Sequence, residues 1–322
     1  MARVLITGAS GFVGSNLCRR LLAGGHALHL VLREGFKAWR IADILDRVRV
    51  HQADLRDAGA VGRAVREARP ERIFHLAAYG AYSSQTDPLR MVETHVAGTV
   101  NLVDACLRAG FGAFVHAGSS SEYGFKDHAP AEDEALDPNS CYAVTKAAAT
   151  HYCRYVARRE RASITTLRLY SVYGPWEEPT RFIPTLILRG MEGTLPPLVD
   201  PETARDYVHV DDVVEAFLLA AEAPAAEPGA VYNVGTGVQT TIREAVEIAR
   251  RVFGIADPPR WGSMTNRIWD TGTWVADARR IHAALGWAPW RAFEDGFRAT
   301  ADWFGKNPSI AEEYRRRAAT TP

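Results

Sequence analysis

A tyrosine and a lysine one helical turn apart could form an acid–base pair. Tyr142 and Lys146 lie in a segment predicted to be helical over 140–160, and the i, i+4 spacing puts both side chains on one face. A phenol exchanges protons poorly at neutral pH because its unperturbed pKa is about 10, and a neighbouring lysine ammonium lowers that pKa. The pair could therefore pass a proton to or from a sugar or alcohol hydroxyl during hydride transfer. A solvated helix face that carries Tyr and Lys is the alternative explanation.

A serine-rich turn could supply another polar group to the same reaction. Ser119, Ser120 and Ser121 follow a predicted strand over 113–117. Because ligands of parallel α/β sheets bind beyond the carboxyl ends of the strands, a serine here could hydrogen-bond the reacting oxygen. An ordinary Ser/Gly turn explains Ser120 and Ser121 well and Ser119 less well. Ser119 is therefore the candidate catalytic serine, and Ser120 is a candidate substrate contact.

A glycine-rich turn near the N-terminus is typical of a phosphate-binding loop. It lies between a predicted strand over 3–7 and a predicted helix over 13–24. Gly8 allows the tight turn, Gly11 removes a side chain where backbone approaches a pyrophosphate, and Gly14 lets helix and strand pack closely. The GxxGxxG spacing gains weight from its strand–turn–helix setting. The cofactor-binding residues predicted in this turn are Gly8, Gly11, Phe12, Val13 and Gly14.

The segments around these residues alternate between strand and helix. Strands are predicted over 3–7, 27–32, 48–51, 72–76, 113–117 and 163–169, and helices over 13–24, 57–68, 87–109 and 140–160. Such alternation implies right-handed crossovers and a Rossmann-type α/β fold, a doubly wound parallel sheet with helices on both faces. After about residue 173, prolines interrupt the pattern, so we expect a smaller, irregular C-terminal lobe over the strand ends.

The expected organisation is a dinucleotide-binding domain and a substrate-binding lobe. The Rossmann domain is expected to cover 1–172, and later strands within about 206–235 return to it. The substrate lobe is then formed by 173–205 and 236–322.

The bulk composition excludes several classes of protein. The chain has 322 residues, with 38 basic and 38 acidic side chains and a net charge of zero. This balance gives no support for a nucleic-acid or membrane-surface partner, which would require a basic excess. The four cysteines form no CxxC pair, so we expect reduced thiols and no metal site. We find no signal peptide and no apolar run of membrane-spanning length, and expect a cytoplasmic protein.

The order and spacing of these motifs resemble those of a known family. The chain is similar to the extended short-chain dehydrogenase/reductases, which include nucleotide-sugar epimerases, 4,6-dehydratases and 4-ketoreductases. The motifs that carry the resemblance are Gly8/Gly11/Gly14, Asp54-Leu55, His75-Leu76-Ala77-Ala78, Ser119, Tyr123-Gly124, Tyr142/Lys146, Arg168, Val172-Tyr173-Gly174-Pro175, the 205–212 segment, the 233–237 segment and Leu285-Gly286-Trp287. They cover nearly the whole chain and are more specific for the superfamily than for the reaction.

The resemblance implies a role for each candidate residue. It makes Tyr142 the acid–base residue, Lys146 the residue that binds the nicotinamide ribose and tunes Tyr142, and Ser119 the residue that orients the substrate. The implied cofactor contacts outside the glycine turn are Asp54 at the adenine, Leu55 packed on it, Arg33, Leu76, Ala77, Ala78, Tyr142 and Lys146. The implied substrate contacts are Ser119, Ser120, Ser171 and two arginines that suit a nucleotide diphosphate, Arg205 and Arg267.

Some positions depart from the family pattern in ways that bear on the cofactor and the reaction. Members that use NAD usually carry an acidic residue at the end of the second strand, where this chain has Arg33 followed by Glu34. NADP(H) is therefore favoured, and NAD(H) is possible. Dehydratases carry acidic residues where this chain has Ser120 and Ser121, and Glu122 lies one place off. Hydroxyls are poor substitutes for the acid and base that water elimination requires, which argues against a dehydratase.

Two further substitutions replace a common Asn by another hydrogen-bonding residue. Ser171 stands where the family often has an Asn at the substrate diphosphate, and His95 where an Asn often supports the core near the catalytic helix. Both keep hydrogen-bonding ability, so the fold and general chemistry are expected to survive.

The sequence favours an NADPH-dependent 4-ketoreductase of a nucleotide-linked 4-keto-6-deoxyhexose. Arg33 favours NADP(H), and NADPH would supply net reduction while Tyr142 protonates the C4 oxygen. The alternative is a nucleotide-sugar 4-epimerase or 4,6-dehydratase with a tightly bound cofactor. A dinucleotide-sensing regulator on the same fold is a remote alternative, against which the presence of Ser119, Tyr142 and Lys146 argues.

Two helices also suggest an oligomer. Family members often dimerise through the helices that correspond to 87–109 and 140–160, so we expect a homodimer. The apolar and partly apolar residues at helical spacing on these two helices are Val100, Val103, Leu107, Ala147, His151 and Tyr155.

Overall fold

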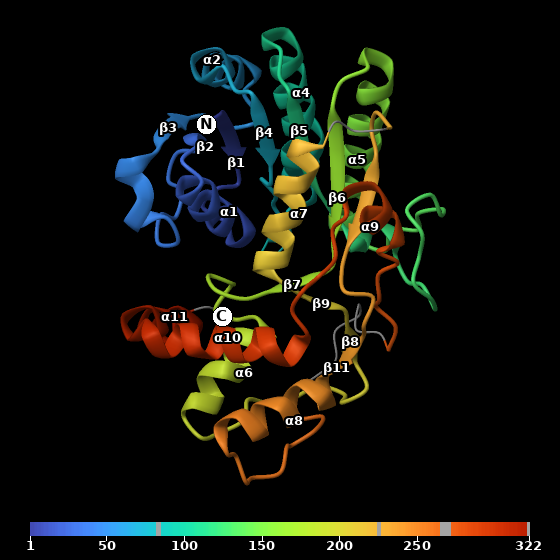
Figure 1. Cartoon of the computed structure of the whole chain (residues 1–322). Helices are drawn as coiled ribbons and strands as arrows, with labels where there is room; N and C mark the ends of the chain where they lie inside the picture. Colours follow the sequence, from blue (N-terminus) through green and yellow to red (C-terminus); the bar gives the residue numbers. More distant parts are fainter. Residues whose placement is uncertain (82–84, 224–226, 265–271, 321–322) are drawn as a thin grey trace.

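The chain folds into alternating strands and helices, labelled in Figure 1. The computed structural model describes residues 1–81, 85–223, 227–264 and 272–320. The strands are β1 (Arg3–Thr7), β2 (Ala27–Leu32), β3 (Arg49–Gln52), β4 (Arg72–His75), β5 (Ala113–Ser119), β6 (Ile164–Leu169), β7 (Ser171–Tyr173), β8 (Ala204–Arg205), β9 (Tyr207–His209), β10 (Val231–Val234) and β11 (Thr240–Thr241). The α-helices are α1 (Phe12–Ala23), α2 (Ala58–Ala68), α3 (Pro88–Val92), α4 (Gly98–Ala109), α5 (Cys141–Glu160), α6 (Phe182–Met191), α7 (Val210–Glu222), α8 (Ile242–Phe253), α9 (Arg279–Leu285), α10 (Phe293–Lys306) and α11 (Pro308–Thr320). The short elements are the 3₁₀ turns η1 (Ala42–Arg47) and η3 (Ser120–Tyr123) and the π turn η2 (Glu93–Ala97).

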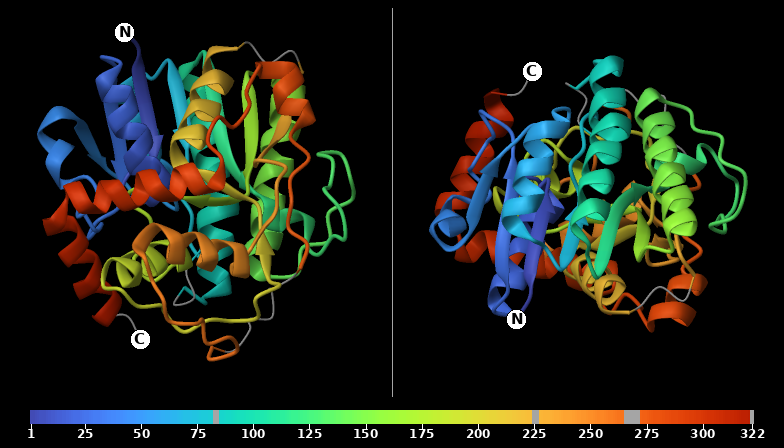
Figure 2. Two further views of the ribbon diagram at one scale, coloured as in Figure 1. Left: turned by 60° about the horizontal axis from the view of Figure 1, so that its bottom comes forward. Right: turned by 90° about the horizontal axis from the view of Figure 1, so that it is seen from above.

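Seven parallel strands form the central sheet, in the order β10-β6-β5-β4-β1-β2-β3. The six strands predicted in the first half of the chain all occur, close to their predicted bounds. Helices α1 and α7 cover one face of the sheet, and α2, α4 and α5 cover the other (Figures 1 and 2). This arrangement confirms the Rossmann-type, doubly wound fold.

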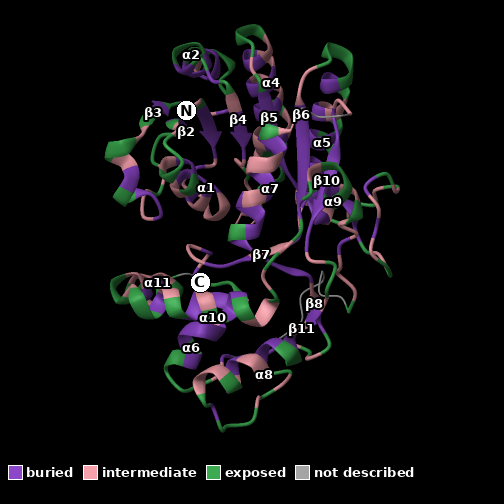
Figure 3. Cartoon of the chain, viewed as in Figure 1, coloured by how far each residue is buried: buried purple, intermediate pink, exposed green. Residues whose placement is uncertain are grey.

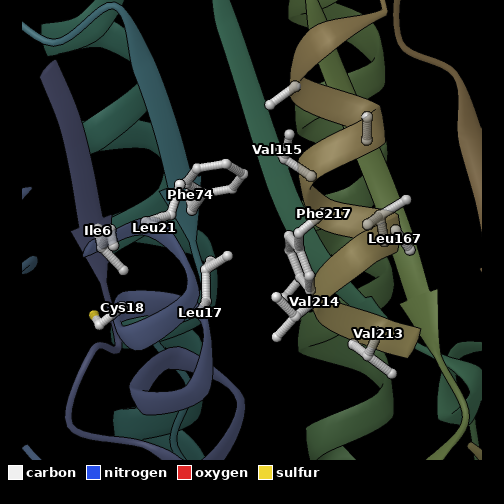
Figure 4. Packing of buried hydrophobic residues seen from close by; sticks show 14 of the residues in the cluster. Ile6, Leu17, Cys18, Leu21, Phe74, Val115, Leu167, Val213, Val214 and Phe217 are labelled. Atoms are coloured by element: carbon white, nitrogen blue, oxygen red, sulfur yellow. The ribbon is translucent and has the colours of Figure 1, made fainter. Parts of the chain in front are cut away.

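Apolar residues on both faces of the strands hold these layers together. Val4 and Ile6 on β1 belong to the core shared with α1 and α7, whereas Leu5 belongs to the core shared with α2, α4 and α5. Figure 4 shows Leu17 of α1 and Phe217 of α7 beside the first of these cores. Burial on both faces explains why the strands read as continuous hydrophobic runs.

The carboxyl ends of the strands lie along one edge of the sheet. The connections that follow β1 and β4 leave this edge in opposite directions. The chain leaves β1 for α1 on one face and β4 for α3 and α4 on the other, which creates the crevice where ligands of such sheets bind. Thr7 and His75 are register partners at the ends of β1 and β4, and Ser119 ends the neighbouring strand β5. The glycine turn and the serine-rich turn therefore open onto the same edge of the sheet.

A separate hydrophobic core organises the C-terminal lobe. It draws residues from the helices α6, α8, α10 and α11, which loops and short strands connect. Pro184 lies in the first turn of α6, where a missing N–H removes no helical hydrogen bond, and the helix continues through it. Figure 3 shows most of α6 buried, next to α10. The domain boundary near residue 172 stays a prediction. Within the described ranges, none of the helices is both long enough and apolar enough to cross a membrane.

Candidate active site

The glycine turn forms a cradle that a side chain would fill. Gly8 has a left-handed backbone (φ +72°), and a Cβ there would lie 2.5 Å from a backbone carbonyl carbon of the loop after β4. A Cβ on Gly14 would overlap the Gly8 carbonyl oxygen. Helix α1 begins with Phe12 and Val13, and the glycine at its N-cap, Gly11, has no side chain to cover the first N–H groups. These N–H groups and the helix dipole suit a pyrophosphate, so the cradle fits a dinucleotide.

The loop after β4 borders this cradle. The Leu76 N–H donates to the Thr7 carbonyl at 3.1 Å, and the Ala77 N–H donates to the Thr7 hydroxyl at 3.3 Å. These bonds hold Leu76, Ala77 and the following Ala78 beside the end of β1. The backbone of Leu76 and Ala77 therefore borders the turn at Gly8, and the cofactor contacts of Leu76, Ala77 and Ala78 stay predictions.

Asp54, the predicted adenine contact, already has a charged partner. The Arg56 N–H donates to Asp54 at 2.9 Å, and the Arg56 guanidinium lies 2.8 Å from the other oxygen of this carboxylate. These hydrogen bonds hold the pKa of Asp54 below its ordinary value, and the charge of Arg33 has a smaller effect in the same direction. Arg33 itself is exposed at the end of β2, and Leu55 is buried against Gly98 of α4.

The predicted acid–base pair lies on the first turns of α5. Ser140 caps this helix by accepting the Ala143 N–H, which fixes where the helix begins. Tyr142 is half-buried and Lys146 is buried, with its ammonium donating to the Ala117 carbonyl of β5 at 2.5 Å. Burial lowers the pKa of Lys146 from 10.5 to about 8, so the ammonium is the main form at neutral pH.

The serine-rich turn folds back on itself at the end of β5. The Ser119 hydroxyl accepts the Ser121 N–H at 3.2 Å, and Glu122 accepts the Ser119 N–H at 2.9 Å, which together form a capping box on η3. Ser120 is buried between them. A hydroxyl that accepts one bond still has a proton to donate, so Ser119 keeps a donor for a substrate oxygen.

The Glu122 carboxylate points into the protein and not into the crevice. Its side chain is 0 % exposed, and one oxygen lies 2.8 Å from the Arg168 guanidinium of β6. The other oxygen accepts the Ser119 N–H and the Thr150 hydroxyl, each at 2.9 Å. Both oxygens are thus occupied by buried donors, which makes Glu122 part of the structural support of the turn.

The predicted substrate contacts come from the strands that lead into the C-terminal lobe. Ser171 begins β7, and its N–H donates to the Asp206 carbonyl at 3.0 Å, next to Arg205 on β8. The Arg205 guanidinium lies 5.6 Å from the Trp274 ring centre. Arg267 lies outside the described residues. The structure therefore places Ser171 beside Asp206, the residue after Arg205, and both strands differ from the helix that carries the acid–base pair.

Two buried polar residues support these groups: Asp206, which the sequence analysis did not single out, and His95, which the resemblance placed near the catalytic helix. Asp206 accepts the N–H groups of Thr236 and Gly237 at 2.7 and 2.9 Å, which anchors the strand that carries Arg205. His95 lies between the loop after β4 and α5, and contacts both. The signal that could have found Asp206 is its position directly after Arg205.

Comparisons with known proteins agree with this geometry. The model of the NAD dependent epimerase/dehydratase family matches residues 4–235. The chain is 34 % identical to a UDP-glucose 4-epimerase of Mycolicibacterium smegmatis, over 94 % of this chain and 98 % of the relative. It is 33 % identical to a dTDP-glucose 4,6-dehydratase of Streptomyces griseus, over 95 % of each. A solved UDP-glucose 4-epimerase of Thermus thermophilus in complex with NAD superimposes with a TM-score of 0.82 at 32 % identity, over 94 % of this chain and 99 % of that one.

These relatives are all enzymes that modify nucleotide sugars. They are nucleotide-sugar epimerases and dehydratases, and the expectation of an enzyme of the extended short-chain dehydrogenase/reductase type is confirmed. The family model spans the glycine cradle, the serine-rich turn and the Tyr142/Lys146 pair. The chain belongs to the NAD dependent epimerase/dehydratase family of nucleotide-sugar-modifying enzymes.

Proposed function

We propose that this protein is a nucleotide-sugar 4-epimerase that acts on a UDP-linked hexose with a nicotinamide dinucleotide. The observation that supports this proposal most is that the Lys146 ammonium, one turn after Tyr142 on α5, donates to the Ala117 carbonyl of β5, the strand that ends at Ser119, while the Glu122 carboxylate is bound inside the protein. The UDP-glucose epimerases among the relatives support the choice of base and sugar.

In this mechanism, residues of the chain handle the proton and hold the sugar. The Tyr142 phenolate takes the proton of the C4 hydroxyl and later returns it to the C4 oxygen. The Lys146 ammonium favours the phenolate, and Ser119 hydrogen-bonds the C4 oxygen. NAD(H), when bound in the glycine cradle, supplies the hydride acceptor and donor at C4.

The position of Glu122 favours an epimerase over a 4,6-dehydratase. Loss of water across C5 and C6 requires an acid and a base near those carbons. At the positions where dehydratases of the family carry acidic residues, this chain has Ser120 and Ser121, whose hydroxyls are weak acids and weak bases. The Glu122 carboxylate is bound to Arg168. An epimerase needs only the proton exchange at C4 that Tyr142 can provide.

The 4-ketoreductase favoured by the sequence is the second candidate. One observation favours it, the exposed Arg33 at the end of β2, which would suit the 2′-phosphate of NADPH. The two candidates differ in stoichiometry, because a reductase consumes one NADPH for each sugar and an epimerase consumes none.

The proposed function is tested by incubating purified protein with UDP-glucose or UDP-galactose, without added reductant, and separating the products by chromatography. Interconversion of the two sugars is the expected result. Oxidation of added NADPH with a 4-keto-6-deoxy sugar, and no interconversion of hexoses, would favour the reductase. Formation of a 4-keto-6-deoxy product from UDP-glucose or dTDP-glucose would establish a dehydratase.

Arg33 is expected to decide the choice between NADP(H) and NAD(H). An arginine on a phosphate contributes on the order of 1 kcal/mol or more at an exposed site, so Arg33→Asp should shift the ratio of the two affinities at least about fivefold toward NAD(H). Fluorescence titration of both reduced cofactors measures this ratio, with Glu34→Gln as the control variant. An unchanged ratio would show that Arg33 does not bind the 2′-phosphate of NADP(H).

The expected homodimer would use a surface formed by α3, η2, α4 and α5, which lie side by side. Of the residues at helical spacing, Val103 and Ala147 are buried in the monomer, so they belong to its core and not to an interface. The exposed apolar residues on this surface are instead Leu89, Val92, Val144 and Tyr155.

A charge on this surface should therefore separate the protomers. We expect light scattering to give about twice the 35.4 kDa chain mass for the wild type at micromolar concentration, and the chain mass itself for Val144→Glu. Val238→Glu is the matched control, because Val238 is an exposed valine on a distant loop. A wild-type protein with the mass of one chain would contradict the expected homodimer.

A further inference from the structure

A cluster of aromatic and arginine side chains connects the two halves of the molecule. Three members come from α1 and from the segment between β2 and β3, and three come from the segment after β7 and from α10 and α11. We call this cluster the interlobe clasp. Its members are Arg19, Trp39, Arg40, Trp176, Trp303 and Tyr314. None of them belongs to the candidate active site, so the proposed reaction leaves the clasp unexplained.

Trp39 belongs to the Rossmann half by sequence but to the C-terminal lobe by packing. Its ring packs against the hydrophobic core of that lobe, whereas Phe36, three residues earlier, packs against the core of α1 and α7. The centre of the Trp39 ring lies 5.5 Å from that of the buried Tyr314 ring of α11. The Arg40 guanidinium lies 4.2 Å from the same Trp39 ring centre. The segment after β2 is therefore anchored in both hydrophobic cores.

Trp176 occupies a strained position at the middle of the clasp. Its backbone is left-handed (φ +70°), which is unfavourable for a residue with a Cβ, so the surrounding contacts must hold it there. The Arg19 guanidinium of α1 lies 4.2 Å from the centre of its ring, and the centre of the Trp303 ring of α10 lies 5.2 Å away. The Trp176 carbonyl accepts a hydrogen bond from Arg40 at 2.7 Å. Contacts from three different elements thus fix this residue.

Polar contacts extend the clasp toward the glycine cradle. The Asn16 amide, in the first turns of α1, donates to the Pro175 carbonyl at 2.9 Å. The Arg19 guanidinium donates to the Arg40 carbonyl at 2.8 Å, and the Arg40 guanidinium lies 2.8 Å from the Glu178 carboxylate. The Arg40 side chain is almost wholly buried, so solvent screens this ion pair little. Helix α1 and the segment after β2 therefore bind the same partner, the segment that follows β7.

The two elements that the clasp holds in the Rossmann half are also those that border the predicted dinucleotide. Helix α1 begins at the glycine cradle, and the segment after β2 begins at Arg33, the predicted contact of the 2′ position. A segment that is already ordered binds its ligand more tightly, because binding then involves a smaller loss of conformational entropy. Linkage makes this effect reciprocal, so a ligand that requires the ordered segment also stabilises the helices that order it.

We propose that the interlobe clasp couples dinucleotide binding to the C-terminal helices. Trp39 positions the segment over 33–48 for the adenosine end of the dinucleotide, and the bound dinucleotide in return stabilises α11. Trp39 is a positioning residue, because it acts through this segment. The inference rests on the proposed function only for the binding of a nicotinamide dinucleotide, and not for the reaction at C4.

The first test is the affinity of the full-length protein, freed of copurified dinucleotide, for NADH and NADPH. Titration of the fluorescence of the reduced nicotinamide measures both affinities. We expect Trp39→Ala to weaken the tighter of the two by about tenfold. Trp39→Phe keeps an aromatic ring between Tyr314 and Arg40, so it should recover at least about half of that loss on a logarithmic scale.

Trp290→Ala is the matched control. Trp290 also carries an arginine over its ring, since the Arg291 guanidinium lies 4.0 Å from the ring centre, but it is 63 % exposed and lies outside the clasp. It should therefore keep dinucleotide affinity within about twofold of wild type.

Hydrogen exchange gives a second readout that depends neither on a substitution nor on activity. In the wild type, saturation with the tighter reduced dinucleotide should slow exchange of the α11 amides at least about threefold. Helix α8 is the internal control, because it contributes to the core of the same lobe but not to the clasp, and its exchange should stay unchanged. In Trp39→Ala, the saturating dinucleotide should no longer slow exchange in α11.

Several results would overturn the coupling. They are wild-type affinity in Trp39→Ala, an equal loss of affinity in Trp290→Ala, wild-type exchange in α11 that does not respond to the dinucleotide, and an equal response in α8. A protein that binds neither NADH nor NADPH would contradict the coupling together with the cofactor assignment. A wild type that shows the coupling but converts no nucleotide sugar would contradict the proposed epimerase and leave the coupling established.

Discussion

Replacing Tyr142 with phenylalanine is expected to lower kcat by about 10²- to 10⁴-fold, the usual contribution of a positioned acid–base group. The substitution removes only the hydroxyl, so the ring keeps its edge-on contact with His95 and the start of α5 is unchanged. Cofactor binding should also survive, because the glycine cradle and Lys146 remain. Stopped-assay kinetics gives kcat, and fluorescence titration gives the affinity for the reduced dinucleotide.

Tyr155→Phe is the matched control for this variant. Tyr155 lies on the same helix, its side chain is exposed, and its hydroxyl contacts only a neighbouring arginine, Arg159, among the described residues. It should therefore retain normal turnover. Near-normal turnover in Tyr142→Phe would remove Tyr142 from the mechanism, whereas loss of dinucleotide binding would show that the substitution disturbs the cradle.

Breaking the buried pair of Glu122 and Arg168 is expected to cost about 3–5 kcal/mol of unfolding free energy, because one partner is left charged and desolvated. The two side chains are almost wholly buried and lie 2.8 Å apart. Arg168 also donates to the Tyr123 hydroxyl and to the Glu132 carbonyl, so Arg168→Met would additionally leave these acceptors unpaired. Urea unfolding of Arg168→Met and Glu122→Gln measures the loss.

An exposed pair provides the control for this effect. Arg243 and Glu202 also lie 2.8 Å apart, but their side chains are 51 % and 69 % exposed. Glu202→Gln should therefore change the unfolding free energy by less than about 1 kcal/mol. A Glu122→Gln variant with wild-type stability that no longer acts on its sugar would contradict the structural assignment of Glu122 and revive the dehydratase.

The sequence predicted the Rossmann half of the fold well, because each strand there is a short apolar run followed by a turn and a periodic helix. The same patterns placed the glycine turn between a strand and a helix and the Tyr142/Lys146 pair on a helix, and the structure has these elements there. The helices of the C-terminal lobe were harder to predict. The proline of α6 suggests a break, but its place in the first turn makes it compatible with a helix.

Side-chain orientation was the other limit of sequence reasoning. Periodicity alone marks Val103 and Ala147 as apolar helix positions, and only the packing shows that they lie inside the monomer. Likewise, the place of Glu122 in the sequence does not reveal where its carboxylate points. The carboxylate points into the protein because it pairs with Arg168, which is distant in the sequence. The hydrogen bonds of His95 also involve partners far along the chain, such as Thr145.

The most direct test of the proposed epimerase follows a deuterium label on C4 of UDP-glucose. An epimerase removes the hydride from C4 and returns it to C4 of the same sugar, so NMR of the product should show UDP-galactose with deuterium retained at C4. Deuterium at C6 of a 4-keto-6-deoxy sugar would contradict the proposal and establish a dehydratase. Recovery of unchanged UDP-glucose, together with NADPH oxidation by a 4-keto sugar, would contradict it in favour of a reductase.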